Sequence, residues 1–89
     1  MNPHPELLAN LEQFVIDLIA RHQRLAPGLV TLDSTFGGLG VDDFDAMEII
    51  LACEETFDVS LPRDIARHGR KVRDMAAALR QELREPAHA

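Results

Sequence analysis

The sequence predicts an all-α fold, a small four-helix bundle with three long helices, one short helix and a long first loop. Three segments repeat their apolar residues at intervals of three and four, the spacing of one face of an α-helix. No segment shows the period of two that is typical of a half-buried strand. A chain of 89 residues can bury one modest core. We therefore expect one domain over 1–89, with its core at 6–84 and loose ends at 1–4 and 86–89.

The first predicted helix covers residues 6–25, with Pro5 suited to its first turn. Pro27 and Gly28 end it and begin a loop that reaches Val41. The apolar face of this helix consists of Leu7, Leu8, Leu11, Val15, Leu18, Ile19 and Leu25. The loop is also rich in apolar residues, namely Leu29, Val30, Leu32, Phe36, Leu39 and Val41. We expect it to pack on the bundle.

The second predicted helix begins after Asp42, a natural N-cap, and ends at Phe57. Asp45, three positions after the cap, takes the place of the glutamate in a capping box. Its interior face is marked by Ile49 and Cys53. The remaining positions mix a wide apolar surface with acids, namely Phe44, Met47, Ile50, Leu51, Glu54 and Phe57.

The last third of the chain predicts a short helix over 62–69, from Pro62 to Gly69, and a long helix over 72–85 that Pro86 closes. The long helix is expected to bury Val72, Met75, Ala76, Leu79 and Leu83.

Charge divides the chain into two unequal parts. The net charge is -6, yet residues 1–62 carry eleven acidic and two basic side chains, whereas residues 63–89 carry seven basic and four acidic ones. An acidic surface repels phosphate backbones and attracts basic proteins, so nucleic acid is not expected as a partner. With no long apolar run and no signal-peptide pattern at its start, the chain is expected to lack a transmembrane segment and to be cytoplasmic.

The sequence offers no catalytic or metal-binding constellation. The histidines His4, His22, His68 and His88 are far apart, and no cysteine or second histidine stands at ligand spacing, so no metal site is expected. The only cysteine, Cys53, lies on an apolar helix face and is expected to be a buried structural thiol. We expect a protein that is not an enzyme.

Three motifs surround the second predicted helix: Leu39-Gly40-x-Asp42 before it, Met47-Glu48-Ile49 one turn into it, and Glu54-Glu55-x-Phe57-Asp58-Val59-x-Leu61-Pro62 at its end. In this order they resemble the core of acyl carrier proteins, and the resemblance extends over about residues 6–84. It implies an acyl-carrier-protein-like bundle in which a serine hydroxyl at the start of the second helix carries phosphopantetheine. Here that position is Asp43. Two further departures are Gly38 in place of the usual aspartate and the basic segment 63–73.

Asp43 has three interpretations. A carboxylate in the first turn of a helix is favoured by the helix dipole by about 0.3–1 kcal/mol, which could explain it without any function. Alternatively, the chain has kept the carrier fold for protein contacts and lost the arm. The third interpretation is a deliberate replacement of the serine. Because Asp43 has no hydroxyl to load, no cofactor is expected, and the two serines of the chain, Ser34 and Ser60, are poor substitutes since neither is followed by the family's helix pattern.

The resemblance also implies a function and a partner surface. We expect a non-catalytic binding subunit or regulator that meets basic surfaces of enzymes in acyl, polyketide, peptide or lipid biosynthesis. The partner-binding residues would be Asp42, Phe44, Asp45, Met47, Glu48, Glu54 and Glu55.

Two alternatives to this function stay open. One is a working acyl or aminoacyl carrier, and the other is a helical bundle that binds a lipid or acyl ligand non-covalently between its helices, where small residues such as Ala52, Ala76, Ala77 and Ala78 leave space. The basic stretch after Pro62 is expected mainly to pair with nearby acids such as Asp64, Asp74 and those of the second helix.

Overall fold

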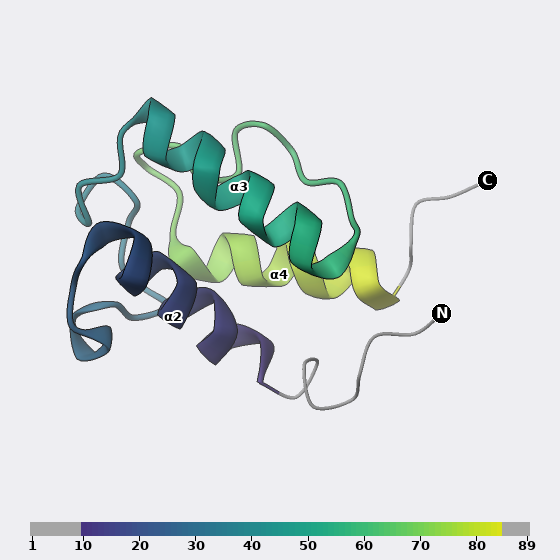
Figure 1. Ribbon diagram of the computed structural model, residues 1–89, viewed down its shortest axis with the longest axis horizontal. Helices are drawn as coiled ribbons and strands as arrows, with labels where there is room; N and C mark the ends of the chain where they lie inside the picture. The colour runs from purple at the N-terminus through teal and green to yellow at the C-terminus, as the bar shows by residue number, and fades with distance from the viewer. Residues whose placement is uncertain (1–9, 85–89) are drawn as a thin grey trace.

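The computed structural model describes residues 10–84, and these form three α-helices, α2 (Leu11–Gln23), α3 (Asp43–Phe57) and α4 (Val72–Arg84). A short 3-10 helix, η1 (Pro27–Leu29), lies in the loop after α2. Figure 1 shows α3 and α4 running in the same direction and α2 in the opposite direction, and α2 packs against both. Strand-type pairing within the described residues is limited to one antiparallel bridge between Thr35 and Lys71. The all-α prediction is confirmed.

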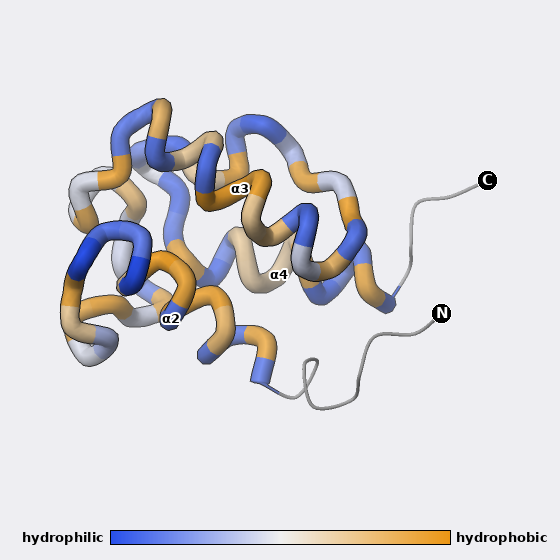
Figure 2. Tube along the Cα trace, in the orientation of Figure 1, coloured by the Kyte–Doolittle hydropathy of each residue, from blue (hydrophilic) through white to orange (hydrophobic). Residues whose placement is uncertain are grey.

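One apolar core joins the three helices, the loop after α2 and the connection between α3 and α4. Figure 2 shows hydrophobic residues spread along every helix and interrupted by hydrophilic ones, as expected when each helix turns one face inward. The largest fully buried side chains are those of Phe36, Leu11, Ile19, Ile49, Ile50, Met75, Leu79, Val15, Val72 and Cys53. Phe14 adds an edge-to-face contact with Phe57 at a centroid distance of 5.0 Å. Ile50 and Phe57, expected on the mixed surface of the second helix, are buried, because the core covers a wider face of α3 than Ile49 and Cys53 alone define.

α2 ends two residues earlier than its apolar pattern predicts. Arg24 takes a left-handed conformation with φ 59°, and the amide of Leu25 donates to the carbonyl of Ala20 at 2.8 Å. This bond closes the helix end and leaves Leu25 partly buried against the core without being helical. The predicted start at residue 6 and the role of Pro5 lie outside the described residues, as do the predicted loose ends.

The loop after α2 is packed, as predicted, with Val30, Phe36 and Val41 buried. Leu29 is an exception, because η1 leaves its side chain 64% exposed. Main-chain hydrogen bonds tie this loop to the start of α4 and the residues before it: the amide of Phe36 donates to the carbonyl of Arg70 at 3.0 Å, among others. The loop therefore has fixed hydrogen-bond partners, which its glycine content alone did not predict.

The predicted helix over 62–69 is wrong, and the short helix of the structure is η1 instead. Separate i to i+3 hydrogen bonds, such as Ile65 to Pro62 at 3.2 Å, form single turns that do not join into a helix. The end of this segment is tied to the loop after α2 instead, because the carbonyls of His68 and Arg70 accept hydrogen bonds from the amides of Gly37 and Phe36. Burial of Ile65 then holds the turns on the core.

α4 begins at Val72 as predicted and is described to Arg84, so Glu85 and Pro86 lie outside the described residues. Val72, Met75, Ala76 and Leu79 are buried as predicted, and Leu83 is partly buried. None of the helices in residues 10–84 has the length and apolar character needed to cross a membrane.

Candidate functional site

The start of α3 is fixed by reciprocal hydrogen bonds between two aspartates. The amide of Asp45 donates to the Asp42 carboxylate at 2.8 Å, and the amide of Asp42 donates to the Asp45 carboxylate at 3.3 Å. This is the predicted capping box, and it satisfies amides that the first turn leaves without helical partners. Asp43, the first helical residue, is exposed beside it.

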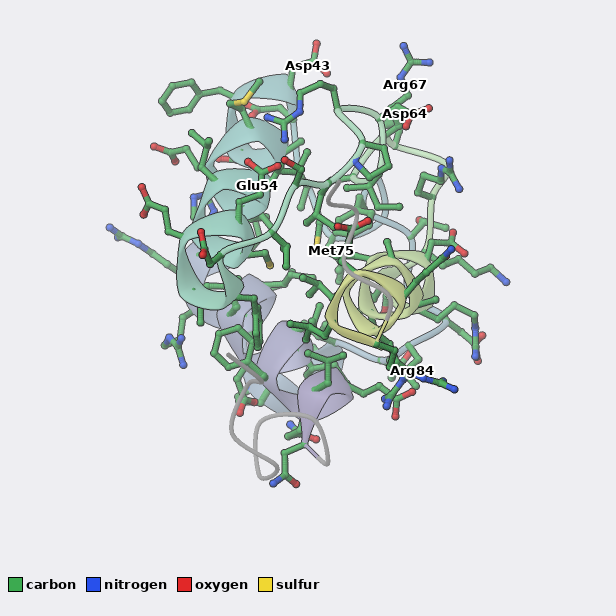
Figure 3. All side chains as sticks on the ribbon, turned by 90° about the vertical axis from the view of Figure 1, so that its right-hand side faces the viewer. Asp43, Glu54, Asp64, Arg67, Met75 and Arg84 are labelled. Carbon is green, nitrogen blue, oxygen red and sulfur yellow. The ribbon has the colours of Figure 1, made fainter. Side chains whose placement is uncertain are left out.

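A depression of about 610 Å³ lies next to Asp43. It is lined by Val41, Asp42, Asp43, Ala66, Arg67, His68 and Gly69. Figure 3 shows Asp43 and Arg67, which both line this depression, at the same end of the molecule. Residues 42–45 are Asp, Asp, Phe and Asp, so the N-cap and first turn of α3 together have three carboxyl groups and no hydroxyl.

One side of α3 exposes large apolar groups between carboxylates. Phe44 is 69% exposed, Met47 42% and Leu51 44%, and they lie together on one helix, whereas exposed apolar residues scattered singly over a surface are ordinary. Glu48 and Glu55 are also exposed on this helix. We call Phe44, Met47, Glu48, Leu51 and Glu55 the exposed face of α3. Leu51 was absent from the predicted partner-binding set, although its spacing of seven from Phe44 could have placed it there.

Glu54, predicted as a partner-binding residue, makes intramolecular contacts instead of facing solvent freely. Its carboxylate accepts a 2.7 Å hydrogen bond from the amide of Leu61 and forms an ion pair with Arg63. The Glu54 side chain is only 16% exposed as a result. Arg63 also donates to the carbonyl of Leu61 at 3.0 Å and approaches the sulfur of Met47 at 3.9 Å. The connection after α3 is thus fastened to the helix by one glutamate.

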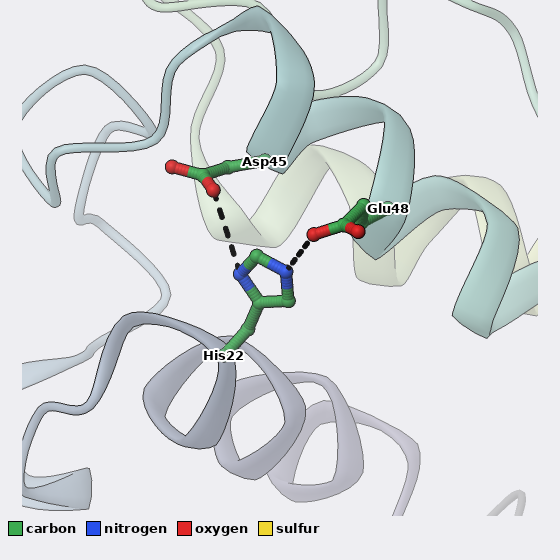
Figure 4. A group of neighbouring side chains, drawn as sticks. All are labelled: His22, Asp45 and Glu48. Atoms are coloured by element: carbon green, nitrogen blue, oxygen red, sulfur yellow. Dashed lines mark hydrogen bonds and ion pairs between the residues drawn. The ribbon is translucent and has the colours of Figure 1, made fainter.

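His22 of α2 contacts two carboxylates near the start of α3. Its Nε2 lies 2.8 Å from a carboxylate oxygen of Glu48, and its Nδ1 lies 3.9 Å from Asp45 (Figure 4). Sequence reasoning missed this group, since only the spacing of three between Asp45 and Glu48 was visible and nothing linked them to a residue on another helix. One ligand-type atom from each of the three lies within 4.8 Å of the others. Both ring nitrogens of His22 already have hydrogen-bond partners in Gln23 and Glu48, so we assign no metal to the group.

Cys53 is fully buried, as predicted, with its Sγ 3.9 Å from the sulfur of Met75. Burial, together with the nearby charge of Glu54, raises the pKa of the Cys53 thiol to about 12. The thiolate that a nucleophile requires is therefore strongly disfavoured.

Three of the five Arg and Lys side chains in the basic segment 63–73 form ion pairs, and the pairs with Glu54 and Asp64 are of the predicted kind. Arg63 meets Glu54, and Arg70 lies 3.9 Å from Asp64. Arg73 pairs with Asp33 of the loop after α2, which lowers the pKa of the Asp33 carboxyl.

Comparison with known proteins decides the family. A family model described as "Phosphopantetheine attachment site" matches residues 13–79. An acyl carrier protein of Amoebophilus asiaticus is 34% identical over 79 residues, covering 88% of this chain and 99% of that protein. The chain belongs to the acyl carrier protein family. Acyl carrier proteins of Phenylobacterium zucineum and Caulobacter vibrioides are 30% and 32% identical, covering 85% and 75% of this chain and 98% and 87% of their own. No solved structure gives a significant match.

Membership of the acyl carrier protein family relates the start of α3 to the attachment site of phosphopantetheine. The family model is named for a phosphopantetheine attachment site, and its match includes α3 and the depression beside Asp43. At the family level these proteins are carriers and not enzymes. In this carrier protein the turn that begins α3 supplies carboxylates only, which do not fit phosphodiester attachment of the arm.

Proposed function

We propose that this acyl carrier protein family member is a non-catalytic binding subunit or regulator that carries no phosphopantetheine arm. It docks through the exposed face of α3 on basic surfaces of enzymes in acyl, polyketide, peptide or lipid biosynthesis. The observation that carries the proposal is the set of large apolar side chains left uncovered between carboxylates on a helix whose first residue is Asp43.

The loss of the arm is supported by the chemistry of Asp43. Loading requires a hydroxyl that attacks the pyrophosphate of coenzyme A, and a carboxylate would instead form an acyl phosphate that water cleaves. The serines elsewhere are poorly placed. The hydroxyl oxygen of Ser34 accepts a hydrogen bond from the Thr31 amide within a turn, and Ser60 lies in the connection after α3, where no helix begins.

Docking is supported by the combination of charge and apolar area on α3. Carboxylates steer a basic partner and set its orientation, while exposed Phe44 and Met47 supply apolar area that contact would remove from water. Asp42, Asp45, Glu48 and Glu55 remain our proposed partner-binding acids. Glu54 contributes less to this role, because Arg63 already neutralises it within the chain.

The first experiment is intact-mass analysis of the chain and of Asp43→Ser after incubation with coenzyme A and a broad-specificity phosphopantetheinyl transferase. We expect the variant alone to gain the mass of the arm. Loading of the unaltered chain would mean that another residue carries the arm and that the protein is a working carrier. Failure of both would mean that the transferase does not recognise this helix.

A second experiment tests the docking surface in the Asp43→Ser background. Glu48→Lys and Glu55→Lys should each slow loading at low salt by about 3- to 10-fold, and added salt should shrink the difference. Glu82→Lys on α4 is the matched charge reversal and should leave the rate unchanged. Equal rates for all three variants at low salt would contradict docking through α3.

A further inference from the structure

The side chain of His22 sits between two carboxylates of α3, and the hydrogen bonds around it define its charge. Nδ1 lies 2.8 Å from Oε1 of Gln23, and Nε2 lies 2.8 Å from a carboxylate oxygen of Glu48. The Gln23 amide is oriented by a second contact, since its Nε2 faces the carbonyl of Leu39 at 3.4 Å. Its oxygen is therefore the atom that faces the ring.

Both partners of the ring accept hydrogen bonds and cannot donate them. An amide oxygen is an acceptor, and so is an ionised carboxylate. Each nitrogen of His22 must then carry a hydrogen for both 2.8 Å contacts to form. A ring with two N–H groups is the imidazolium cation, so this arrangement belongs to the protonated state of His22.

The surroundings of His22 favour that state. The hydrogen bond with Gln23 raises the pKa of His22 above its usual value of 6.5, helped by the hydrogen bond with Glu48 and by the charges of Asp45 and Glu48, while partial burial opposes the rise. These are the groups that face the ring from α3 and from α2 itself. The side chain is 24% exposed, so a proton can exchange with solvent.

We infer that His22 is a further residue of the proposed docking site, whose protonation withdraws Asp45 and Glu48 from a basic partner and whose deprotonation releases them. The inference rests on the proposed function. Glu48 belongs to the exposed face of α3, and Asp45 borders it. A cation held between these two carboxylates neutralises the negative charge that an arginine or lysine of a partner would otherwise contact.

The direction of the effect follows from the sign of the shift. Because folding raises the pKa of His22, the imidazolium stabilises the folded chain below the unfolded value of 6.5, and this contribution disappears as pH rises through the folded pKa. Partner affinity changes in the opposite sense. It increases as pH rises through that same value, since loss of the proton restores the negative charge of the site.

The test has two parts, the protonation state of His22 in the isolated protein and the affinity of the protein for a partner. Nitrogen-15 NMR of the imidazole ring reports which nitrogens carry hydrogen, and a titration gives the pKa. We expect both nitrogens of His22 to be protonated at pH 6, with a midpoint above 6.5. Affinity for the phosphopantetheinyl transferase is then measured from pH 5.5 to 8.5 for the unaltered chain, His22→Gln and His22→Lys, each checked for folding by circular dichroism.

The pH dependence of the transferase itself affects all variants equally, so it cancels when the affinities of the variants are compared at each pH. Relative to His22→Gln, the unaltered chain should bind about two- to fivefold more weakly at pH 5.5 and equally at pH 8.5. His22→Lys, a permanent cation, should bind weakly throughout. A ratio that stays constant across pH would overturn the inference, as would a His22 midpoint at or below 6.5. Absence of binding by every variant at every pH would overturn the assignment of His22 to a docking site, although a midpoint above 6.5 would still establish its ion pair with α3. The loss of the arm is judged separately by the intact-mass experiment.

Discussion

Replacing Glu54 with alanine should lower the free energy of unfolding of this protein. The replacement removes intramolecular contacts as well as a surface charge. The carboxylate of Glu54 accepts the hydrogen bond of the Leu61 amide at 2.7 Å and pairs with Arg63. Leu61 is only 5% exposed, so its amide has little access to water once the carboxylate is gone. The change therefore leaves a nearly buried donor without a partner.

The magnitude follows from these contacts. A hydrogen bond to a charged group contributes about 1.5–3 kcal/mol, and leaving a buried donor unsatisfied costs about as much. The ion pair adds about 0.2–1 kcal/mol, because the Arg63 side chain is half exposed and solvent screens it. We expect Glu54→Ala to lower the free energy of unfolding by about 2–3 kcal/mol, and the midpoint of thermal unfolding by about 8–24 °C.

The assay is urea and thermal unfolding followed by far-ultraviolet circular dichroism, because the chain has no tryptophan or tyrosine to report by fluorescence. Glu55→Ala is the matched control, an exposed glutamate one residue along the same helix, and it should change stability by less than about 0.5 kcal/mol. Arg63→Ala should fall between the two, and the double variant gives the coupling of the pair. Equal stability of Glu54→Ala and Glu55→Ala would refute the assigned role of Glu54.

Three further predictions concern packing, burial and capping. Gly37→Ala should destabilise the fold by about 1–3 kcal/mol in urea unfolding, because an added Cβ would lie 2.9 Å from the carbonyl oxygen of His68, whereas Gly28→Ala meets nothing within 4 Å and should be neutral. Cys53 should resist a disulfide reagent at pH 8 in the native protein and react at once in urea, and rapid native reaction would contradict its burial. Asp42→Ala should cost about 0.5–2 kcal/mol by the same unfolding assay, with most of it restored in Asp42→Asn, and equal losses in both would argue against the cap.

Local spacing was sufficient to predict the features of α3 that depend on neighbours in sequence. The capping box joins Asp42 to Asp45, three residues apart, and the inward positions Ile49 and Cys53 follow from the helical period. The motifs around α3 likewise predicted the family before the fold was seen. These features depend on contacts within one or two turns, which composition and period determine directly.

Tertiary structure decided the features in which distant segments compete for the same groups. The segment after Pro62 forms single turns and not a helix, and the loop after α2 holds its end through hydrogen bonds to the carbonyls of His68 and Arg70. Glu54 turns toward Leu61, and His22 meets Glu48 across 26 positions, although each of these acids looked like a free surface charge in the sequence.

The sequence by itself thus determined the three long helices, the inward positions Ile49 and Cys53, and that Asp43 begins α3. Only the fold decided which acids remain available to a partner. The physical reason is that a carboxylate on a helix surface can bind water, a partner protein or a group of its own chain with similar energy. It binds a cation or amide of its own chain only where packing brings that group within hydrogen-bond distance.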